Sequence, residues 1–297
     1  MRAGSKRRPA GQADTLAFVN HRLLDVRGLK LHAVERGEGE LTVLLHGWLD
    51  HAGSFDLLAP LLPGRTVALD FRGHGDSQWV GPGGFYHFVD YVADLDGALE
   101  VLSPQESVRL VGHSMGAAAG LIYAATRPGR VSHLTLIDAV PLSISTPEIP
   151  ARLGSYLEDL RHIPRKRRRV ESVEYAAQRL LRNNALLSEK AARLLAEGGI
   201  APDPEQENAL AWKWDPLLRA HSPLPISEPV IQLICAQATV PILAIRGETG
   251  MLPDEPDLRA RFPHLKMSVQ TVPNTGHHVH LDAPEAVANL ISAAWAR

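Results

Sequence analysis

The amino-acid sequence predicts an α/β fold: a doubly wound, mostly parallel sheet that carries an inserted helical segment. Three observations support this fold class. Short apolar runs alternate with helical patterns along the first 140 residues, as strands and helices do in a doubly wound sheet. The alternation stops at Pro141 and resumes near Val240. Between an apolar run and a small-residue run stands Gly112-His113-Ser114-Met115-Gly116, which predicts a sharp turn from strand to helix.

The individual elements follow from local patterns of apolar residues. Two extended patterns, at 21–26 and 29–34, flank Arg27-Gly28 and predict an opening antiparallel hairpin. The nearly continuous apolar run at 41–45 is typical of a parallel strand buried on both faces. Further strands are expected at 66–69, 108–111, 131–137, 240–245 and 266–272. Helical spacing predicts helices through Phe55 to Leu62, from about Tyr86 to Leu102, after Ser114, around Leu258 and from Pro284 to Trp295.

The region that interrupts the sheet pattern contains helical patterns, many prolines and no convincing strands. We therefore expect residues 16–140 and 237–297 to form the core, and residues 141–236 to form a helical cap. Residues 1–15 are basic, and no apolar segment follows them, so we expect a disordered tail and no signal peptide. No stretch reaches the ~20 apolar residues of a membrane span. These features predict a cytoplasmic protein that does not enter a membrane.

Composition excludes several classes of partner. The 297 residues are 45% hydrophobic, which is enough for a large core with an insertion. A net charge of −2 gives no overall basic field for nucleic acid or anionic membranes. The single cysteine, Cys235, forms no internal disulfide. The basic run Arg165 to Arg169 is expected to be a solvated face, with steering of an anionic substrate or nucleic acid as the alternatives. Without interleaved aromatic residues, we expect no nucleic-acid binding.

The Gly-x-Ser-x-Gly motif predicts a nucleophile elbow at Ser114. Gly112 and Gly116 suit such an elbow because they place no β-carbon where strand and helix come close. The following helix begins at Met115, so its first amide points toward whatever Ser114 attacks and favours a developing negative charge.

Four further motifs carry a resemblance to a known family: His46-Gly47-Trp48-Leu49-Asp50, Asp70-Phe71-Arg72-Gly73-His74-Gly75, Tyr86-His87-Phe88-Val89-Asp90-Tyr91 and His277-His278-Val279-His280-Leu281. From about Leu23 to its end, the chain resembles the α/β-hydrolase superfamily, and within it the serine-hydrolase-like subgroup. The layout is similar to that of haloalkane dehalogenases and epoxide hydrolases, which use an aspartate where this chain has Ser114. Dehalogenases bind halide with a tryptophan after the nucleophile; Met115 stands there, which disfavours dehalogenation.

The resemblance implies the α/β-hydrolase fold and assigns the site residues. The base is His277, after Gly276, on the loop that follows the last strand. The amides of Trp48 and Met115 are implied to form the oxyanion hole, and the Trp48 side chain to line the substrate pocket.

The acid of the implied triad departs from the commonest layout of the superfamily. That layout places an aspartate just after the strand at 240–245, but the turn here is Gly247-Glu248-Thr249-Gly250. Dehalogenase-like relatives supply their acid from the position of Asp138, which we therefore expect to orient His277. Glu248 is the next candidate, followed by Asp254 and Glu255. The alternative role for Asp138 is to cap the turn at Pro141.

Other polar residues of these motifs are expected to have structural roles. His277, His278 and His280 form His-His-x-His, which could indicate a metal, but no second cluster at ligand spacing accompanies them. We therefore expect no metal and no cofactor. His113 is expected to shape the elbow. The residues of the second motif are expected to form the frame of a tight turn: Asp70, Arg72 and His74.

These features predict hydrolysis of a small carboxylic ester or related acyl compound through an acyl-enzyme on Ser114. A lactonase, a perhydrolase and a carbon–carbon bond hydrolase would use the same constellation. From a different class, a non-catalytic binding protein could keep the elbow as scaffold.

Overall fold

The computed structural model describes residues 19–143, 146–184, 187–223 and 226–296. Its centre is an eight-stranded sheet with the order β1-β2-β4-β3-β5-β6-β10-β11. The strands are β1 (Asn20–Val26), β2 (Leu29–Arg36), β3 (Leu41–Leu45), β4 (Arg65–Leu69), β5 (Val108–His113), β6 (Val131–Ile137), β10 (Ile242–Gly247) and β11 (Met267–Val272). Only the pairings of β2 with β1 and with β4 are antiparallel within this sheet. The predicted α/β class with a mostly parallel sheet is confirmed.

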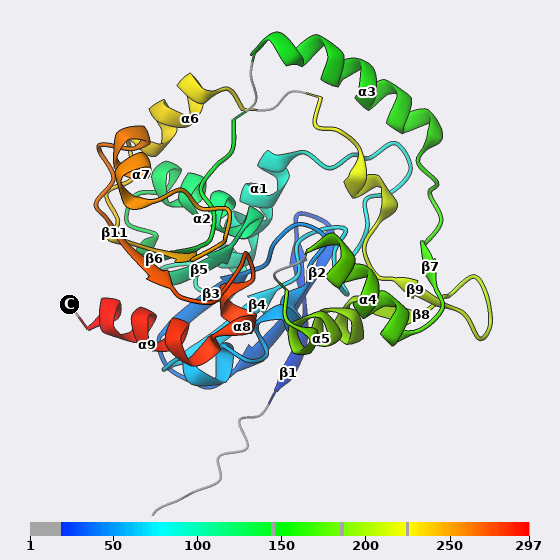
Figure 1. Cartoon of the computed structure of the whole chain (residues 1–297), viewed down its shortest axis with the longest axis horizontal. Helices are drawn as coiled ribbons and strands as arrows, with labels where there is room; N and C mark the ends of the chain where they lie inside the picture. The colour runs from blue at the N-terminus through cyan, green and yellow to red at the C-terminus, as the bar shows by residue number, and fades with distance from the viewer. Residues whose placement is uncertain (1–18, 144–145, 185–186, 224–225, 297) are drawn as a thin grey trace, which may run out of the picture.

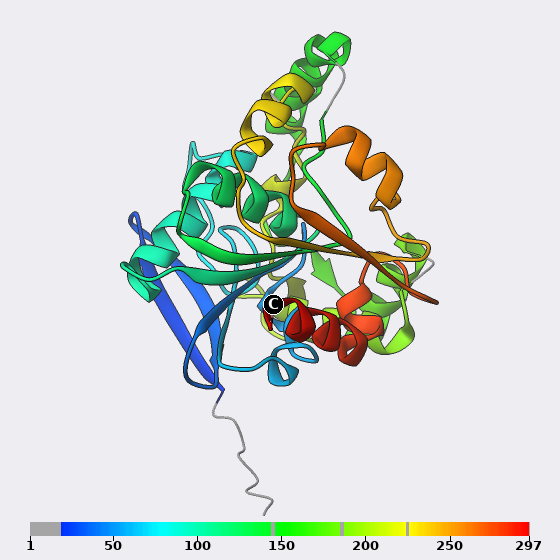
Figure 2. The same cartoon turned by 90° about the vertical axis from the view of Figure 1, so that its left-hand side faces the viewer.

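Alternate residues of the central strands enter two separate cores, one on each face of the sheet. Every residue of β3 is buried; Val43 packs in one core and Leu44 in the other. The first core includes α1 (Phe88–Leu102) and α2 (Met115–Thr126), and the second includes α8 (Val279–Asp282) and α9 (Pro284–Trp295). Figure 2 shows α9, in red, on one side of the sheet and the green α2 on the other.

One predicted helix is shorter than expected. In place of a helix from Phe55 to Leu62, the chain forms two 3₁₀ turns, η1 (Ala52–Phe55) and η2 (Ala59–Leu61). Pro60 lies inside this pattern and Pro63 follows it, and proline supplies no N–H for a continuing helix. Phe55, Leu58 and Leu62 are buried nonetheless, whereas Leu61 is exposed, so the pattern predicted burial in part and helix length incorrectly.

The inserted segment follows β6 and ends before β10, which are neighbours in the sheet. It contains η3 (Thr146–Glu148), α3 (Ile149–His162), α4 (Val173–Asn183), α5 (Glu189–Gly199), η4 (Pro216–Arg219) and α6 (Glu228–Cys235). The expectation of no strands was wrong. A small antiparallel sheet has the order β7-β9-β8: β7 (Arg169–Val170), β9 (Leu210–Trp212) and β8 (Ile200–Pro202). Strands of two or three residues are too short to show an alternating pattern.

Helix α3 stands apart from the sheet and buries none of its residues (Figure 1). In contrast, α6 packs on α2, with Ile231 and Cys235 buried in the first core. Helix α7 (Glu255–Arg261) lies between β10 and β11 in the chain, as expected around Leu258. The division into core and cap stays a prediction, and the predicted tail at 1–15 lies outside the described residues. Within the described ranges, no helix combines the length and apolar character needed to span a membrane.

Candidate active site

Ser114 lies on the turn between β5 and α2 with backbone angles φ 51° and ψ −116°. A residue with a side chain rarely adopts a positive φ, and such strain is concentrated at functional sites. The flanking glycines make the turn possible. A β-carbon on Gly112 would lie 2.5 Å from the Ala117 nitrogen, and one on Gly116 would lie 2.2 Å from the Leu45 oxygen. The motif therefore has the strand, turn and helix context that the sequence predicts.

The structure brings Ser114, His277 and Asp138 together. His277 Nε2 lies 3.0 Å from Ser114 Oγ, and His277 Nδ1 lies 2.8 Å from Asp138 Oδ2. The three residues follow β5, β11 and β6, so they meet at the carboxyl edge of the parallel strands. The Asp138 side chain is fully buried, whereas His277 keeps 18% of its side chain exposed. A serine hydroxyl, an imidazole and a carboxylate are thus in hydrogen-bond contact, which is the arrangement of a Ser-His-Asp triad.

Backbone amides of the turn after β10 also bond the Asp138 carboxylate. Its oxygens accept hydrogen bonds from the amides of Gly247 (3.0 Å), Met251 (2.7 Å) and Leu252 (3.4 Å). A β-carbon on Gly250 would lie 2.2 Å from Asp138 Oδ1, so only glycine fits beside this carboxylate. Backbone donors and the lack of a side chain at Gly250 therefore fix the position of the Asp138 carboxylate, and its role as the acid stays a prediction.

The other candidates for the acid make different contacts. Glu248 accepts a hydrogen bond from the Asn274 amide at 2.9 Å and is exposed to solvent. Asp254 caps the start of α7, and Glu255 forms an ion pair with Arg259 one helical turn later. These contacts leave Asp138 as the carboxylate in contact with His277.

The loop that carries Trp48 lies against the elbow. A β-carbon on Gly47 would lie 3.2 Å from the Ser114 Cβ, which places this backbone beside the nucleophile. The Trp48 indole donates a hydrogen bond to the Leu218 carbonyl of η4 at 3.1 Å, and Trp48 remains 52% exposed. Met115 is the first residue of α2, where amides lack partners within the helix. The oxyanion role of the Trp48 and Met115 amides stays a prediction.

Three further histidines surround His277. The ring of His113 lies 4.6 Å from His277, 4.8 Å from His278 and 4.5 Å from His280, measured between centroids. Burial and the neighbouring histidines hold the pKa of His113 and of His280 well below its ordinary value. His113 Nε2 donates to the His277 carbonyl at 3.0 Å, which ties the elbow to the loop of the base. Neutral His113 thus has a contact that shapes the site.

Asp50 is a buried residue of this region that the sequence reasoning did not single out. It follows Trp48 by two residues, and its Oδ1 accepts a hydrogen bond from the His51 amide at 2.9 Å. Its Oδ2 faces His113 Nδ1 at 3.9 Å. The signal in the sequence was its place at the end of His46-Gly47-Trp48-Leu49-Asp50.

The tight turn after β4 is a hydrogen-bonded frame around buried Asp70. Burial alone would raise the pKa of Asp70, but the hydrogen bond from His32 and the nearby His46 and His51 lower it to about 2. Burial lowers the pKa of His74 to about 3, and His74 Nδ1 donates to the Arg72 carbonyl at 3.0 Å. These residues support the fold around the site and do not contact Ser114 in the described hydrogen bonds.

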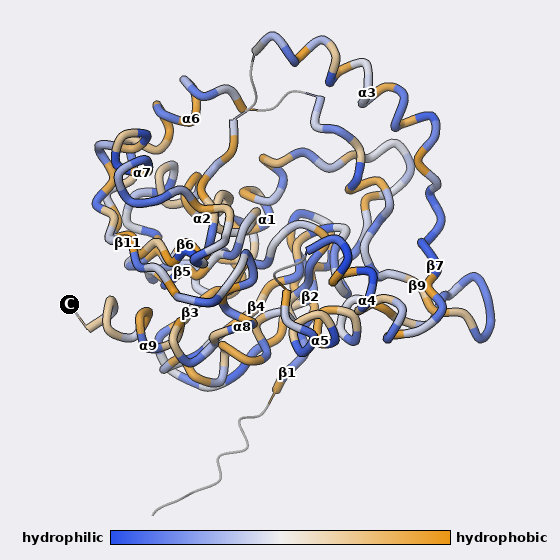
Figure 3. Tube along the Cα trace, viewed as in Figure 1, coloured by the Kyte–Doolittle hydropathy of each residue, from blue (hydrophilic) through white to orange (hydrophobic). Residues whose placement is uncertain are grey.

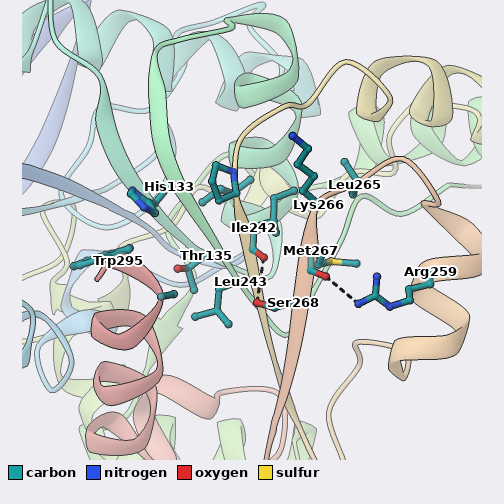
Figure 4. Close-up of a pocket in the computed structure, with 13 residues that line it drawn as sticks. His133, Thr135, Ile242, Leu243, Arg259, Leu265, Lys266, Met267, Ser268 and Trp295 are labelled. Carbon is teal, nitrogen blue, oxygen red and sulfur yellow. Dashed lines mark hydrogen bonds between the residues drawn. The ribbon is translucent and has the colours of Figure 1, made fainter. Parts of the chain in front are cut away.

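Two cavities are lined by residues other than Ser114, His277 and Asp138. One, of about 380 Å³, is at the amino ends of β6, β10 and β11 beside His133, Ile242 and Met267 (Figure 4). Ser114 follows the carboxyl end of β5, so this cavity lies at the opposite edge of the sheet. Ligands of open α/β sheets bind at the carboxyl edge, which argues against substrate binding here.

The second cavity, of about 320 Å³, gives the basic run a location. Its lining includes Lys166, Arg167 and Arg168, the apolar ring of Trp214, and Arg219 of η4. The segment before β7 is strongly hydrophilic in Figure 3. This cavity therefore brings the positive charge of the segment before β7 next to Arg219 of η4, the element that Trp48 contacts through its indole.

The chain is similar to known proteins over most of its length. A sequence model described as the alpha/beta hydrolase family matches residues 42–290. A crystal structure of a hypothetical protein from Pseudomonas aeruginosa PAO1 is similar, with 34% identity and a TM-score of 0.83 over 93% of this chain and 99% of that chain. A serine hydrolase-like protein of Danio rerio is 29% identical over 86% of this chain and 81% of its own length. A 2-(acetamidomethylene)succinate hydrolase of Mesorhizobium japonicum is 29% identical over 93% of this chain and 96% of its own length.

Proposed function

The chain belongs to the α/β hydrolase family, and on that premise we propose that it is a serine hydrolase acting on a small carboxylic ester or related acyl compound. One observation carries this proposal: the continuous hydrogen-bonded chain from Ser114 Oγ through His277 to buried Asp138. A hydroxyl is a weak nucleophile unless a positioned base removes its proton. We assign the role of that base to His277 and the role of the carboxylate that orients it to Asp138.

The proposed reaction has two halves. Ser114 Oγ attacks the acyl carbon while its proton passes to His277 Nε2, and Asp138 stabilises the imidazolium through Nδ1. The amides of Trp48 and Met115 stabilise the negative oxygen of the tetrahedral intermediate. His277 then gives the proton to the leaving alcohol, and an acyl-enzyme remains. In the second half His277 removes a proton from water, whose oxygen attacks the acyl carbon of the ester on Ser114. His277 then returns the proton to Ser114 Oγ as the bond between that oxygen and the acyl carbon breaks, and the carboxylic acid leaves.

Backbone strain supports catalysis over a role as a binding scaffold alone. Ser114 and Asp138 both have positive φ, at 51° and 52°. Such conformations cost about 1–3 kcal/mol each and persist where function requires them. A binding protein would have no use for two strained residues that meet on one histidine. Lactonase, perhydrolase and carbon–carbon hydrolase activities remain alternatives on the same site.

A panel of substrates tests the proposal. Chromogenic acyl esters of increasing chain length, together with lactones, are assayed with the wild type and with Ser114→Ala. We expect ester turnover that Ser114→Ala abolishes, with a preference for short chains. Turnover of lactones alone would assign a lactonase, and turnover that survives Ser114→Ala would exclude the proposed nucleophile.

A second candidate is an acyl substrate that carries its own negative charge. The cavity beside η4 is lined by Arg168 and Arg219 with no carboxylate in its lining, so these cations have no local counter-charge there. The similar hydrolase of Mesorhizobium japonicum is named for a succinate, a dicarboxylate. Here Arg168→Ala and Arg219→Ala should raise KM for a carboxylate-bearing ester and leave KM for its neutral analogue unchanged. Arg193→Ala, on the exposed side of α5, is the matched control.

A further inference from the structure

Asp50, His113 and His280 form a buried cluster beside the proposed triad. Their residues are 7%, 1% and 0% exposed. One ligand atom from each lies within 4.8 Å of the others. The three residues come from three segments that are distant in sequence: the loop after β3, the end of β5, and α8. The fold therefore assembles a donor set that no stretch of the sequence contains.

Four side-chain atoms of this cluster lack hydrogen-bond partners among the described residues. They are Asp50 Oδ2, His113 Nδ1 and both ring nitrogens of His280. His113 Nε2 donates to the His277 carbonyl, so in the neutral ring Nδ1 carries a lone pair. This lone pair faces Asp50 Oδ2, another acceptor, at 3.9 Å. Two buried acceptors cannot bond each other, and a cation or a donor between them would resolve the conflict.

We propose that Asp50, His113 and His280 bind one Zn²⁺ ion. Two imidazole nitrogens and one carboxylate oxygen are a donor set that zinc prefers, with a fourth position left for water. The three ligand atoms lie no more than 4.8 Å from one another, so an ion placed at equal distance from them would be within about 2.8 Å of each. Zinc bonds to nitrogen and oxygen ligands are about 2.0–2.2 Å long. Each side chain therefore moves by less than about 1 Å to close the site.

Outer hydrogen bonds already orient two of the ligands. Asp50 Oδ1 accepts from the His51 amide, and His113 Nε2 donates to a backbone carbonyl, as metal-binding histidines usually do. Another histidine–carboxylate cluster, around His32, differs because its histidine already bonds a carboxylate oxygen at 2.7 Å.

The position of the ligands predicts what the ion does. Asp50 follows Trp48 by two residues, His113 precedes Ser114, and His280 follows His277 by three. An ion here would join the three segments that carry the proposed oxyanion loop, nucleophile and base. Its role is therefore to fix their relative positions and stabilise the fold, without contact to the reacting atoms.

Metal binding is measured on the untagged full chain after EDTA treatment and dialysis. Zn²⁺ is added, and stoichiometry is read by equilibrium dialysis with elemental analysis, while Tm is followed by circular dichroism. We expect one tightly bound Zn²⁺ per chain and a Tm that rises with free zinc, because an ion that binds only the folded state stabilises it. Asp50→Asn and His280→Gln should each lose this binding and the rise in Tm.

Matched variants separate this site from its neighbours. Asp76→Asn removes a carboxylate from the cluster around His32, and His277→Ala removes the proposed base; both should keep one zinc per chain. X-ray absorption spectroscopy at the zinc edge, on the zinc-loaded wild type, should show two imidazole nitrogens and oxygen ligands around the ion. This measurement does not depend on whether any variant folds. Absence of stoichiometric binding, binding unchanged in Asp50→Asn, loss of binding in Asp76→Asn or His277→Ala, or a different ligand shell would each overturn the proposal.

Discussion

Replacing Asp138 with asparagine tests how the proposed base is oriented. Asp138 Oδ2 lies 2.8 Å from His277 Nδ1, and this carboxylate also accepts hydrogen bonds from three backbone amides. Asparagine keeps the size of the side chain but has one acceptor oxygen in place of two. Both oxygens of Asp138 accept from backbone N–H groups, so the NH₂ group of asparagine faces a donor in either orientation. In the orientation that also places it against His277, it favours the wrong tautomer of the ring.

The expected loss follows from the role of this carboxylate. Neutralising the acid of a Ser-His-Asp triad typically lowers kcat by about 10³–10⁴. At 1.36 kcal/mol per tenfold change, this is about 4–5.5 kcal/mol of transition-state stabilisation. KM should change little, because Asp138 is buried behind His277 and has no route to substrate. The assay is kcat for a chromogenic ester at saturating substrate, with circular dichroism to confirm folding.

Glu248→Gln is the matched control, because Glu248 is the next candidate for the acid. Its carboxylate bonds the Asn274 amide on the protein surface, so its loss should change kcat by less than about threefold. Near wild-type kcat in folded Asp138→Asn, together with a large loss in Glu248→Gln, would refute the assignment of Asp138.

Ser114→Ala and His277→Ala should each remove most of kcat. The double variant should be scarcely worse than either, since the effects of residues that act as a unit are not additive. Additive losses in measured kcat would contradict a shared mechanism. Gly250→Ala should lower kcat at least tenfold, because its methyl would displace the Asp138 carboxylate, while Gly154→Ala, with open space at its β-carbon, should match wild type in the same assay. The free energy of unfolding should fall as pH drops below about 6.5, because histidines that stay neutral in the folded protein bind protons once the chain unfolds. The fall should reach up to about 1.4 kcal/mol per pH unit for each such histidine. Four buried histidines have a pKa below the ordinary value, chiefly because of burial: His46, His74, His113 and His280. The pKa of His32 is raised, because the Asp70 hydrogen bond and the charges of Asp70 and Asp76 together outweigh burial, and this opposes only part of the loss. Urea unfolding that shows rising stability on acidification would contradict the prediction.

The central sheet was predictable because its signals are local. Each strand of the core carries its own apolar run, and the run at 41–45 is buried throughout as expected. The short strands of the inserted segment were not predictable, because β7 to β9 pair through backbone contacts over two or three residues. A proline inside an apolar pattern likewise shortened the expected helix at 55–62 to 3₁₀ turns.

The candidate site was predictable where a motif fixes both residue and position. Ser114, His277 and Asp138 were singled out from the sequence, and the structure places them in contact. Their surroundings were not predictable. The amides that hold Asp138 come from a turn more than 100 residues later, and Asp50 meets His280 only through the fold. Such contacts depend on the packing of separate segments, which no local pattern records.

The activated state of Ser114 is the central claim, and a fluorophosphonate probe tests it most directly. Intact-mass spectrometry after incubation should show one adduct per wild-type chain, and peptide mapping should locate it on Ser114. Ser114→Ala should gain no adduct, and His277→Ala should react far more slowly, because the hydroxyl then lacks its base. A folded wild-type chain that stays unlabelled, or that is labelled equally in Ser114→Ala, would contradict the account.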